Sequence, residues 1–219
     1  MSPKWFADRR AAGRELGAHL ARDPRRDVVV LGLPRGGVIL AAEVAGALGA
    51  PLDVLVVRKL GLPWQPELAM GAIAAVGDTV ETVRVEPVLA AAHVRPDVFD
   101  EVRTEELAEL RRREITYRGG RAPLDLRGRA VVVVDDGLAT GATMRAAVIA
   151  VRRQAPERIT VAVPIGSPTA CAALASDVDE VVCLQAPLSF RAVGQAYDDF
   201  SATTDEEVRA ALADGGTRL

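Results

Sequence analysis

Two adjacent carboxylates, Asp135 and Asp136, follow a run of four valines and precede a turn of small residues. Such a run is typical of a strand that is buried on both faces of a parallel sheet, and a helix-compatible segment, MRAAVIAVRRQ, follows the turn. The first backbone N–H groups of a helix lack partners and favour an anion, so this turn can bind a phosphate. The carboxylates can instead accept hydrogen bonds from ribose hydroxyls or face a hydrated divalent cation.

The turn supplies five candidate phosphate-binding residues, namely Ala139, Thr140, Gly141, Ala142 and Thr143. The threonine hydroxyls are donors, and a glycine lets the backbone approach phosphate oxygens closely. Ribose hydroxyls held beside a 5′-phosphate describe a phosphoribosyl group. The simpler alternative is an ordinary strand-to-helix turn with a surface acidic pair, whereas a Walker P-loop is excluded because no Gly-Lys-Ser/Thr follows.

The strand, the acidic pair and the A-T-G-x-T turn over residues 131–143 resemble the phosphoribosyl pyrophosphate (PRPP) motif of type I phosphoribosyltransferases. The resemblance implies Mg²⁺-dependent transfer of a 5-phosphoribosyl group from PRPP to a nitrogenous, nucleobase-like acceptor, with release of pyrophosphate. It assigns catalytic positions to Asp135 and Asp136, which would hold the ribose hydroxyls and contact Mg²⁺ indirectly. Ala139 replaces an aspartate of the hypoxanthine and guanine members, so a general acid/base is missing there and 6-oxopurine transfer is less expected.

A second glycine turn, PRGG at residues 34–37, lies between an apolar strand at 27–33 and a clean helix pattern. The resemblance assigns this turn to the pyrophosphate of PRPP and implies a cis peptide between Pro34 and Arg35. Two basic residues end the next predicted strand, 51–60, and could also meet a pyrophosphate, although a solvated basic pair is the alternative. The candidate pyrophosphate residues are Arg35, Gly36, Gly37, Arg58 and Lys59.

Apolar runs that alternate with helical patterns predict an α/β fold, with an open, mainly parallel sheet in the order 3-2-1-4-5-6 and helices on both faces. The six strands of this sheet are predicted at 27–33, 51–60, 69–76, 130–135, 158–165 and 180–185. The alternation over 77–85 predicts a further, solvent-facing strand that could form one arm of a hairpin. If the first and fourth are neighbours, the two glycine turns face each other at the crevice where such sheets bind ligands. An amphipathic helix is predicted over 7–22, with Asp8 as a possible cap.

We expect one domain over residues 1–219, with two additions to the α/β frame. The segment 59–129 occupies the place of the family's flexible catalytic loop and is predicted to be a lid with a helical insertion. The segment 186–203 holds three of the eight aromatic residues and is a candidate hood over the acceptor. Phe190 or Tyr197 could stack on an acceptor ring there, and aromatics that cover a sheet edge are an equal alternative.

The net charge of −3 lacks the basic excess of a nucleic-acid binder, and no apolar run is long enough to cross a membrane. We therefore expect a soluble cytoplasmic protein whose partners are PRPP and a small-molecule acceptor, with no nucleic acid and no membrane; assembly as a homodimer is left open. Cys171 and Cys183 form no CxxC pattern and are interpreted as small buried hydrophobes. A non-catalytic regulator that binds PRPP or a nucleotide, and a ribosyl-bond hydrolase, are the alternative functions.

Overall fold

The computed structural model describes residues 5–23, 25–76 and 79–216. Its centre is a five-stranded parallel sheet in the order β2-β1-β6-β7-β8. The strands are β1 (Val28–Gly32), β2 (Leu52–Val54), β6 (Ala130–Val134), β7 (Arg158–Ile165) and β8 (Glu180–Gln185). Strands β1 and β6 are neighbours, which confirms the pairing that brings the two predicted turns to one edge.

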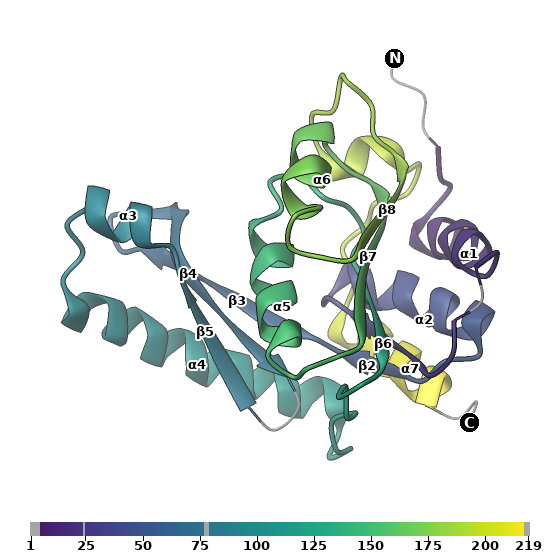
Figure 1. Ribbon diagram of the computed structural model, residues 1–219, viewed down its shortest axis with the longest axis horizontal. Helices are drawn as coiled ribbons and strands as arrows, with labels where there is room; N and C mark the ends of the chain where they lie inside the picture. Colours follow the sequence, from purple (N-terminus) through teal and green to yellow (C-terminus); the bar gives the residue numbers. More distant parts are fainter. Residues whose placement is uncertain (1–4, 24, 77–78, 217–219) are drawn as a thin grey trace.

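Helices cover both faces of this sheet, as predicted (Figure 1). One face carries α1 (Arg9–Leu20), α2 (Gly36–Leu48) and α7 (Asp205–Gly216), and the other carries α5 (Ala142–Arg152) and α6 (Pro168–Leu174). Successive residues of β6 alternate between the two cores, Val132 and Val134 facing the first group of helices and Val131 and Val133 the second. Burial on both faces explains why the strand is an unbroken run of valines.

The predicted position of the third strand is wrong. Residues 69–76 belong to β4 (Gln65–Val76), which pairs antiparallel with β3 (Val56–Leu62) and with β5 (Thr79–Arg84) in a separate three-stranded sheet. The predicted strand 51–60 is divided at Leu55 between β2 and β3. A parallel neighbour needs a crossover of a dozen or more residues, and the two residues between β3 and β4 permit only a hairpin.

The segment 59–129 is thus largely a folded subdomain, which projects from the central sheet in Figure 1. It contains most of the antiparallel sheet, α3 (Glu86–Ala91) and the long helix α4 (Pro96–Arg118). Phe99 and Leu110 of α4 are almost fully buried and belong to the same core as Leu60 and Ile73 of the antiparallel sheet. Its action as a lid stays a prediction.

The segment 186–203, which we call the hood, runs back from β8 towards the residues that lead into α1 and contains the 3₁₀ helix η1 (Val193–Ala196). The backbone N–H groups of Trp5 and Phe6 both donate to the carbonyl of Ala196, at 2.9 and 3.0 Å. An isolated parallel bridge joins Phe6 to Tyr197. The hood is therefore packed against the residues that lead into α1.

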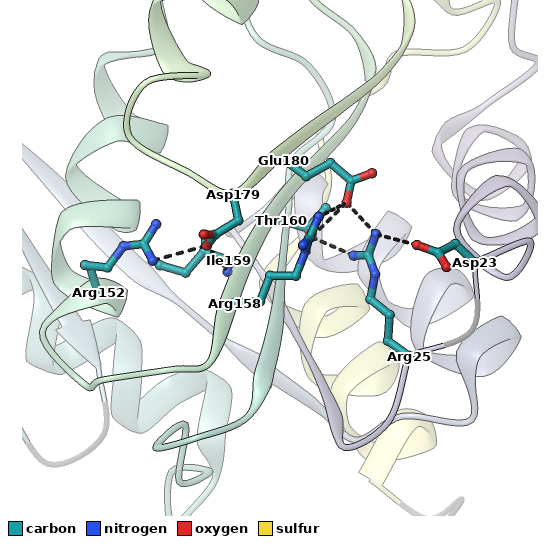
Figure 2. Close-up of polar contacts among 8 residues, drawn as sticks. All are labelled: Asp23, Arg25, Arg152, Arg158, Ile159, Thr160, Asp179 and Glu180. Carbon is teal, nitrogen blue, oxygen red and sulfur yellow. Dashed lines mark hydrogen bonds and ion pairs between the residues drawn. The ribbon is translucent and has the colours of Figure 1, made fainter.

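Ion pairs fasten the opposite edge of the sheet, where β7 and β8 begin (Figure 2). Arg25 donates to Oγ1 of Thr160 at 2.6 Å and pairs with Glu180, while Arg152 contacts Asp179 at 3.1 Å. A hydrogen bond from the backbone N–H of Ile159 is the main reason that the pKa of Asp179 is lowered. This cluster lies at the amino ends of the strands, whereas the two glycine turns follow the carboxyl ends. We therefore interpret the cluster as structural.

Candidate functional site

The PRGG turn lies in direct contact with the acidic pair. A Cβ atom added to Gly36 would fall 2.0 Å from Oδ2 of Asp136, and one added to Gly37 would fall 2.9 Å from Oδ1 of Asp135. A Cβ atom added to Gly37 would also fall 2.8 Å from the carbonyl oxygen of Val134. The peptide between Pro34 and Arg35 is cis, as the resemblance implied. Only glycine fits at these positions, so the start of α2 can approach the acidic pair closely.

The turn after the acidic pair presents the start of α5 to solvent. Its N-cap residue is Gly141, which has a left-handed φ of 78°, and no side chain of the described residues caps the helix. The turn is anchored from behind, since the N–H of Leu138 donates to the carbonyl of Ile165 at 2.9 Å and Ser167 Oγ donates to the carbonyl of Ala139 at 3.0 Å. Ala139, Thr140, Ala142 and Thr143 are exposed. The first turn of the helix can therefore receive an anion.

The acidic pair is half-buried between the two turns. Oδ1 of Asp135 accepts a hydrogen bond from the backbone N–H of Asp136 at 2.8 Å. Burial raises the pKa of Asp135 well above its usual range, and the neighbouring charge of Asp136 raises it further. Burial also raises the pKa of Asp136, although the guanidinium of Arg9 opposes that shift. A nearby cation therefore favours the charged form of Asp136.

Arg9 supplies this cation, and the sequence analysis did not identify it. Its Nε lies 2.9 Å from Oδ2 of Asp136, and the two side chains are only 13% and 19% exposed. Arg9 occupies the first position of α1, directly after Asp8, which caps the helix as predicted by accepting from the N–H of Ala11. The local sequence pattern does not distinguish Arg9 from Arg10. The contact between Arg9 and Asp136 therefore becomes apparent only in the three-dimensional structure.

Tyr197 supports the site instead of offering a face to an acceptor, which corrects its predicted role. Its hydroxyl donates to the carbonyl oxygen of Asp136 at 2.6 Å, and the residue is 1% exposed. Its ring packs between Phe6, at 5.8 Å between centroids, and Phe200, at 5.0 Å. Burial raises the pKa of the Tyr197 hydroxyl. Phe190 is half-buried against the core, and its contact with an acceptor stays a prediction.

Arg58 and Lys59 both belong to β3 in the antiparallel sheet. Arg58 Nε donates to Glu106 at 2.6 Å, and Lys59 Nζ lies 3.3 Å from Glu67. Each basic side chain therefore already has an acidic neighbour within the subdomain. A role in binding pyrophosphate would require an exchange of these partners, and it stays a prediction.

The described residues contain no group of three or more His, Cys, Asp or Glu side chains that could hold a metal ion. The carboxylates of Asp135 and Asp136 are oxygen donors of the kind that Mg²⁺ takes, and they would face it through water or ligand hydroxyls. Within the same residues no helix is long and apolar enough to span a membrane. The two cysteines are half-buried, and burial raises the pKa of the Cys183 thiol to about 12.

The chain matches the phosphoribosyl transferase domain family over residues 8–200, and it belongs to that family. It is 45% identical to the protein TT1426 from Thermus thermophilus, whose crystal structure it matches with a TM-score of 0.83 over 95% of this chain and 97% of that one. It is also 50% identical over 209 residues to Rv0571c from Mycobacterium tuberculosis, whose name assigns that protein provisionally to the phosphoribosyl transferases. This match covers 95% of the chain and 46% of Rv0571c, so the chain spans about half the length of that relative.

Proposed function

We propose that this chain transfers a 5-phosphoribosyl group from PRPP to a nitrogenous, nucleobase-like acceptor and releases pyrophosphate. The observation that carries the proposal is the direct contact between the PRGG turn and the acidic pair, beside an uncapped helix start. Two candidate anion-binding turns with carboxylates beside them match the 5′-phosphate, the pyrophosphate and the ribose hydroxyls of PRPP. Membership of the phosphoribosyl transferase domain family supports the same assignment.

The groups of PRPP can be assigned to three parts of the site. The start of α5, with the hydroxyls of Thr140 and Thr143, would hold the 5′-phosphate, and the PRGG turn would hold the pyrophosphate. Asp135 and Asp136 would accept hydrogen bonds from the ribose hydroxyls and would face Mg²⁺ through them or through water. Arg58 and Lys59 would add positive charge to the pyrophosphate side on release from their acidic neighbours.

The reaction is displacement of pyrophosphate from C1 of the ribose by an acceptor nitrogen. The transition state carries oxocarbenium character, so the carboxylates beside the ribose stabilise developing positive charge. No covalent nucleophile is needed, since the turns orient the two reactants and hold the leaving group in place. A bound Mg²⁺ would neutralise negative charge on the pyrophosphate.

Pyrophosphate release is the measurement that tests this proposal. The protein is incubated with Mg²⁺ and PRPP, alone and with each member of a panel of nucleobases. Release that requires one base supports transfer; release without any base indicates a ribosyl-bond hydrolase, and binding without release indicates a PRPP-responsive regulator. Either of the last two results contradicts the proposed reaction.

Replacement of Asp136 by Asn tests the ribose-binding role directly. The Asp136→Asn variant keeps the size of the side chain but removes its charge, so we expect PRPP affinity to fall by about tenfold or more, the worth of one charge-assisted hydrogen bond. Asp100→Asn, on the exposed surface of α4, is the matched control and should bind as the wild type does. Unchanged affinity in Asp136→Asn would contradict the assignment.

A further inference from the structure

Arg9 joins three parts of the chain that are far apart in sequence. Its Nε donates to Asp136 at 2.9 Å, and its NH1 group donates to the carbonyl oxygen of Ser201 in the hood at 2.7 Å. The carbon of its guanidinium lies 3.9 Å from the centroid of the Phe200 ring. The start of α1, the acidic turn and the hood are thus connected through one side chain.

The contacts of Arg9 depend on the shape of a guanidinium group. A planar fork can donate in two directions while its face lies on an aromatic ring, and this arrangement fixes the direction of each donor. A lysine ammonium at this position would keep the positive charge but could not make all three contacts in the same geometry. The site therefore uses the form of Arg9 as well as its charge.

Phe200 is itself held in place. Its ring stacks on Tyr197 with 5.0 Å between centroids and 27° between planes, and a Cβ atom added to Gly194 would fall 2.9 Å from Cδ1 of Phe200. Tyr197 also donates to the backbone carbonyl of Asp136. The hood therefore fixes Asp136 twice, at the backbone through Tyr197 and at the carboxylate through Arg9.

The carboxylate is held where a ligand would need it. Arg9 contacts Oδ2 of Asp136, so the second oxygen, Oδ1, can still accept a hydrogen bond from a ligand hydroxyl. A Cβ atom added to Gly36 would meet both groups, at 2.0 Å from Oδ2 of Asp136 and 2.6 Å from Nε of Arg9. The Arg9–Asp136 pair thus lies directly against the turn assigned to pyrophosphate.

We propose that Arg9 is a positioning residue for the ribose subsite, and that the hood sets the affinity for PRPP by holding Arg9 through Phe200 and Ser201. The inference rests on the proposed function, because it takes PRPP as the ligand of Asp136. It assigns the hood a task beyond covering an acceptor: hood residues that do not touch PRPP determine how tightly PRPP binds.

The test is calorimetric titration of Mg²⁺ and PRPP into five proteins, namely wild type, Arg9→Met, Arg9→Lys, Phe200→Ala and the double variant Arg9→Met/Phe200→Ala. We expect Arg9→Met to weaken binding by about tenfold to a hundredfold, as for a lost charge-assisted hydrogen bond, and Arg9→Lys to restore part of the loss. Phe200→Ala should weaken binding several-fold in the Arg9 protein and cause no further loss in the Arg9→Met background. Such non-additivity between Arg9 and Phe200 would not arise if the two substitutions caused independent structural defects, because independent losses add.

Arg10→Met is the matched control, because Arg10 is the next residue of α1, is exposed and pairs with Glu43 at 3.0 Å. It should bind PRPP as the wild type does. The inference is overturned if Arg9→Met binds as tightly as the wild type, or if the losses in the double variant simply add. Should Arg9→Met fail to fold, Arg9→Lys and Phe200→Ala still decide the matter, since equal wild-type affinity in both would refute it.

The same titration separates this inference from the proposed function. Wild-type protein that binds PRPP but shows no coupling between Arg9 and Phe200 refutes the inference alone. Binding and coupling without pyrophosphate release refute the transfer reaction and leave the role of Arg9 intact. Wild-type protein that does not bind PRPP refutes both.

Discussion

The contact between the PRGG turn and the acidic pair can be tested by replacing Gly36 with Ala. The added methyl group would lie 2.0 Å from Oδ2 of Asp136 and 2.6 Å from Nε of Arg9, far inside van der Waals contact. Gly36 is the first residue of α2. Its backbone cannot move away from Asp136 without disturbing the packing of Gly37 against Val134. The carboxylate and the guanidinium must therefore separate.

The expected cost follows from the interaction that is lost. The pair is only 13% and 19% exposed, so a charge-assisted hydrogen bond of about 1.5–3 kcal/mol is broken or bent. Alanine is favoured over glycine inside a helix by up to about 1 kcal/mol, which offsets part of that loss. We expect Gly36→Ala to lower the free energy of unfolding by about 1–2 kcal/mol.

Urea denaturation of Gly36→Ala measures the change in the free energy of unfolding. The sign of that change tests whether the added methyl group meets Asp136 and Arg9. Without the close contact, helix propensity alone would make the variant as stable as the wild type or more stable, and that result would refute the geometry. The same substitution in an Asp136→Ala background is the control. There the principal obstacle is gone and Arg9 is released, so the additional cost should largely disappear.

Three further predictions concern single side chains. Tyr197→Phe should lower the free energy of unfolding by about 1 kcal/mol, measured in urea, because it removes the hydroxyl that donates to Asp136 but keeps the ring between Phe6 and Phe200; an unchanged stability would contradict this. Because burial raises the pKa of the Cys183 thiol to about 12, little of it is ionised at pH 8, and alkylation by iodoacetamide followed by mass spectrometry should be slow at this residue in native protein. Hydrogen bonds from Arg112 and Arg113 lower the pKa of Glu109 to about 2, so its stabilising contribution is present above its ordinary pKa of 4.5 and is lost as the pH falls towards 2; an NMR titration with a midpoint near 4.5 would contradict these pairs.

The positions of the two candidate ligand-binding turns could be predicted from the sequence because their signals are local. Each turn follows a strand that is buried on both faces, so an apolar run stops abruptly just before the residues of interest, at Leu33 and at Val134. Parallel strands place all such stops at one edge of the sheet, and this fixes the contact between the PRGG turn and the acidic pair. Strand order and local pattern were sufficient for this part of the site.

The antiparallel subdomain could be predicted only in part, because the alternation over 77–85 indicated one arm of a hairpin but the sheet membership of its other strands was missed. Residues 51–60 read as one apolar strand, whereas the chain changes sheets at Leu55, where the backbone N–H still donates to Gly32 of β1. The difference depends on what the following hairpin packs against, and Phe99, the residue that covers it from α4, lies about 40 positions later in the chain. The periodicity of apolar residues indicates that a residue is buried, but it does not indicate to which sheet the residue belongs.

Arg9 shows the same limit at the site itself. The first turn of α1 contains two adjacent arginines, and the helical pattern treats them alike. The cap at Asp8 fixes where the helix begins and therefore the direction in which each arginine points: Arg9 towards Asp136 and the hood, Arg10 towards Glu43 on α2. The contact of Arg9 spans 127 positions along the chain, and its second partner, Ser201, lies 192 positions away. A motif locates the candidate ligand-binding turns, whereas the cation that pairs with Asp136 is determined by the packing of α1 and the hood against the acidic pair.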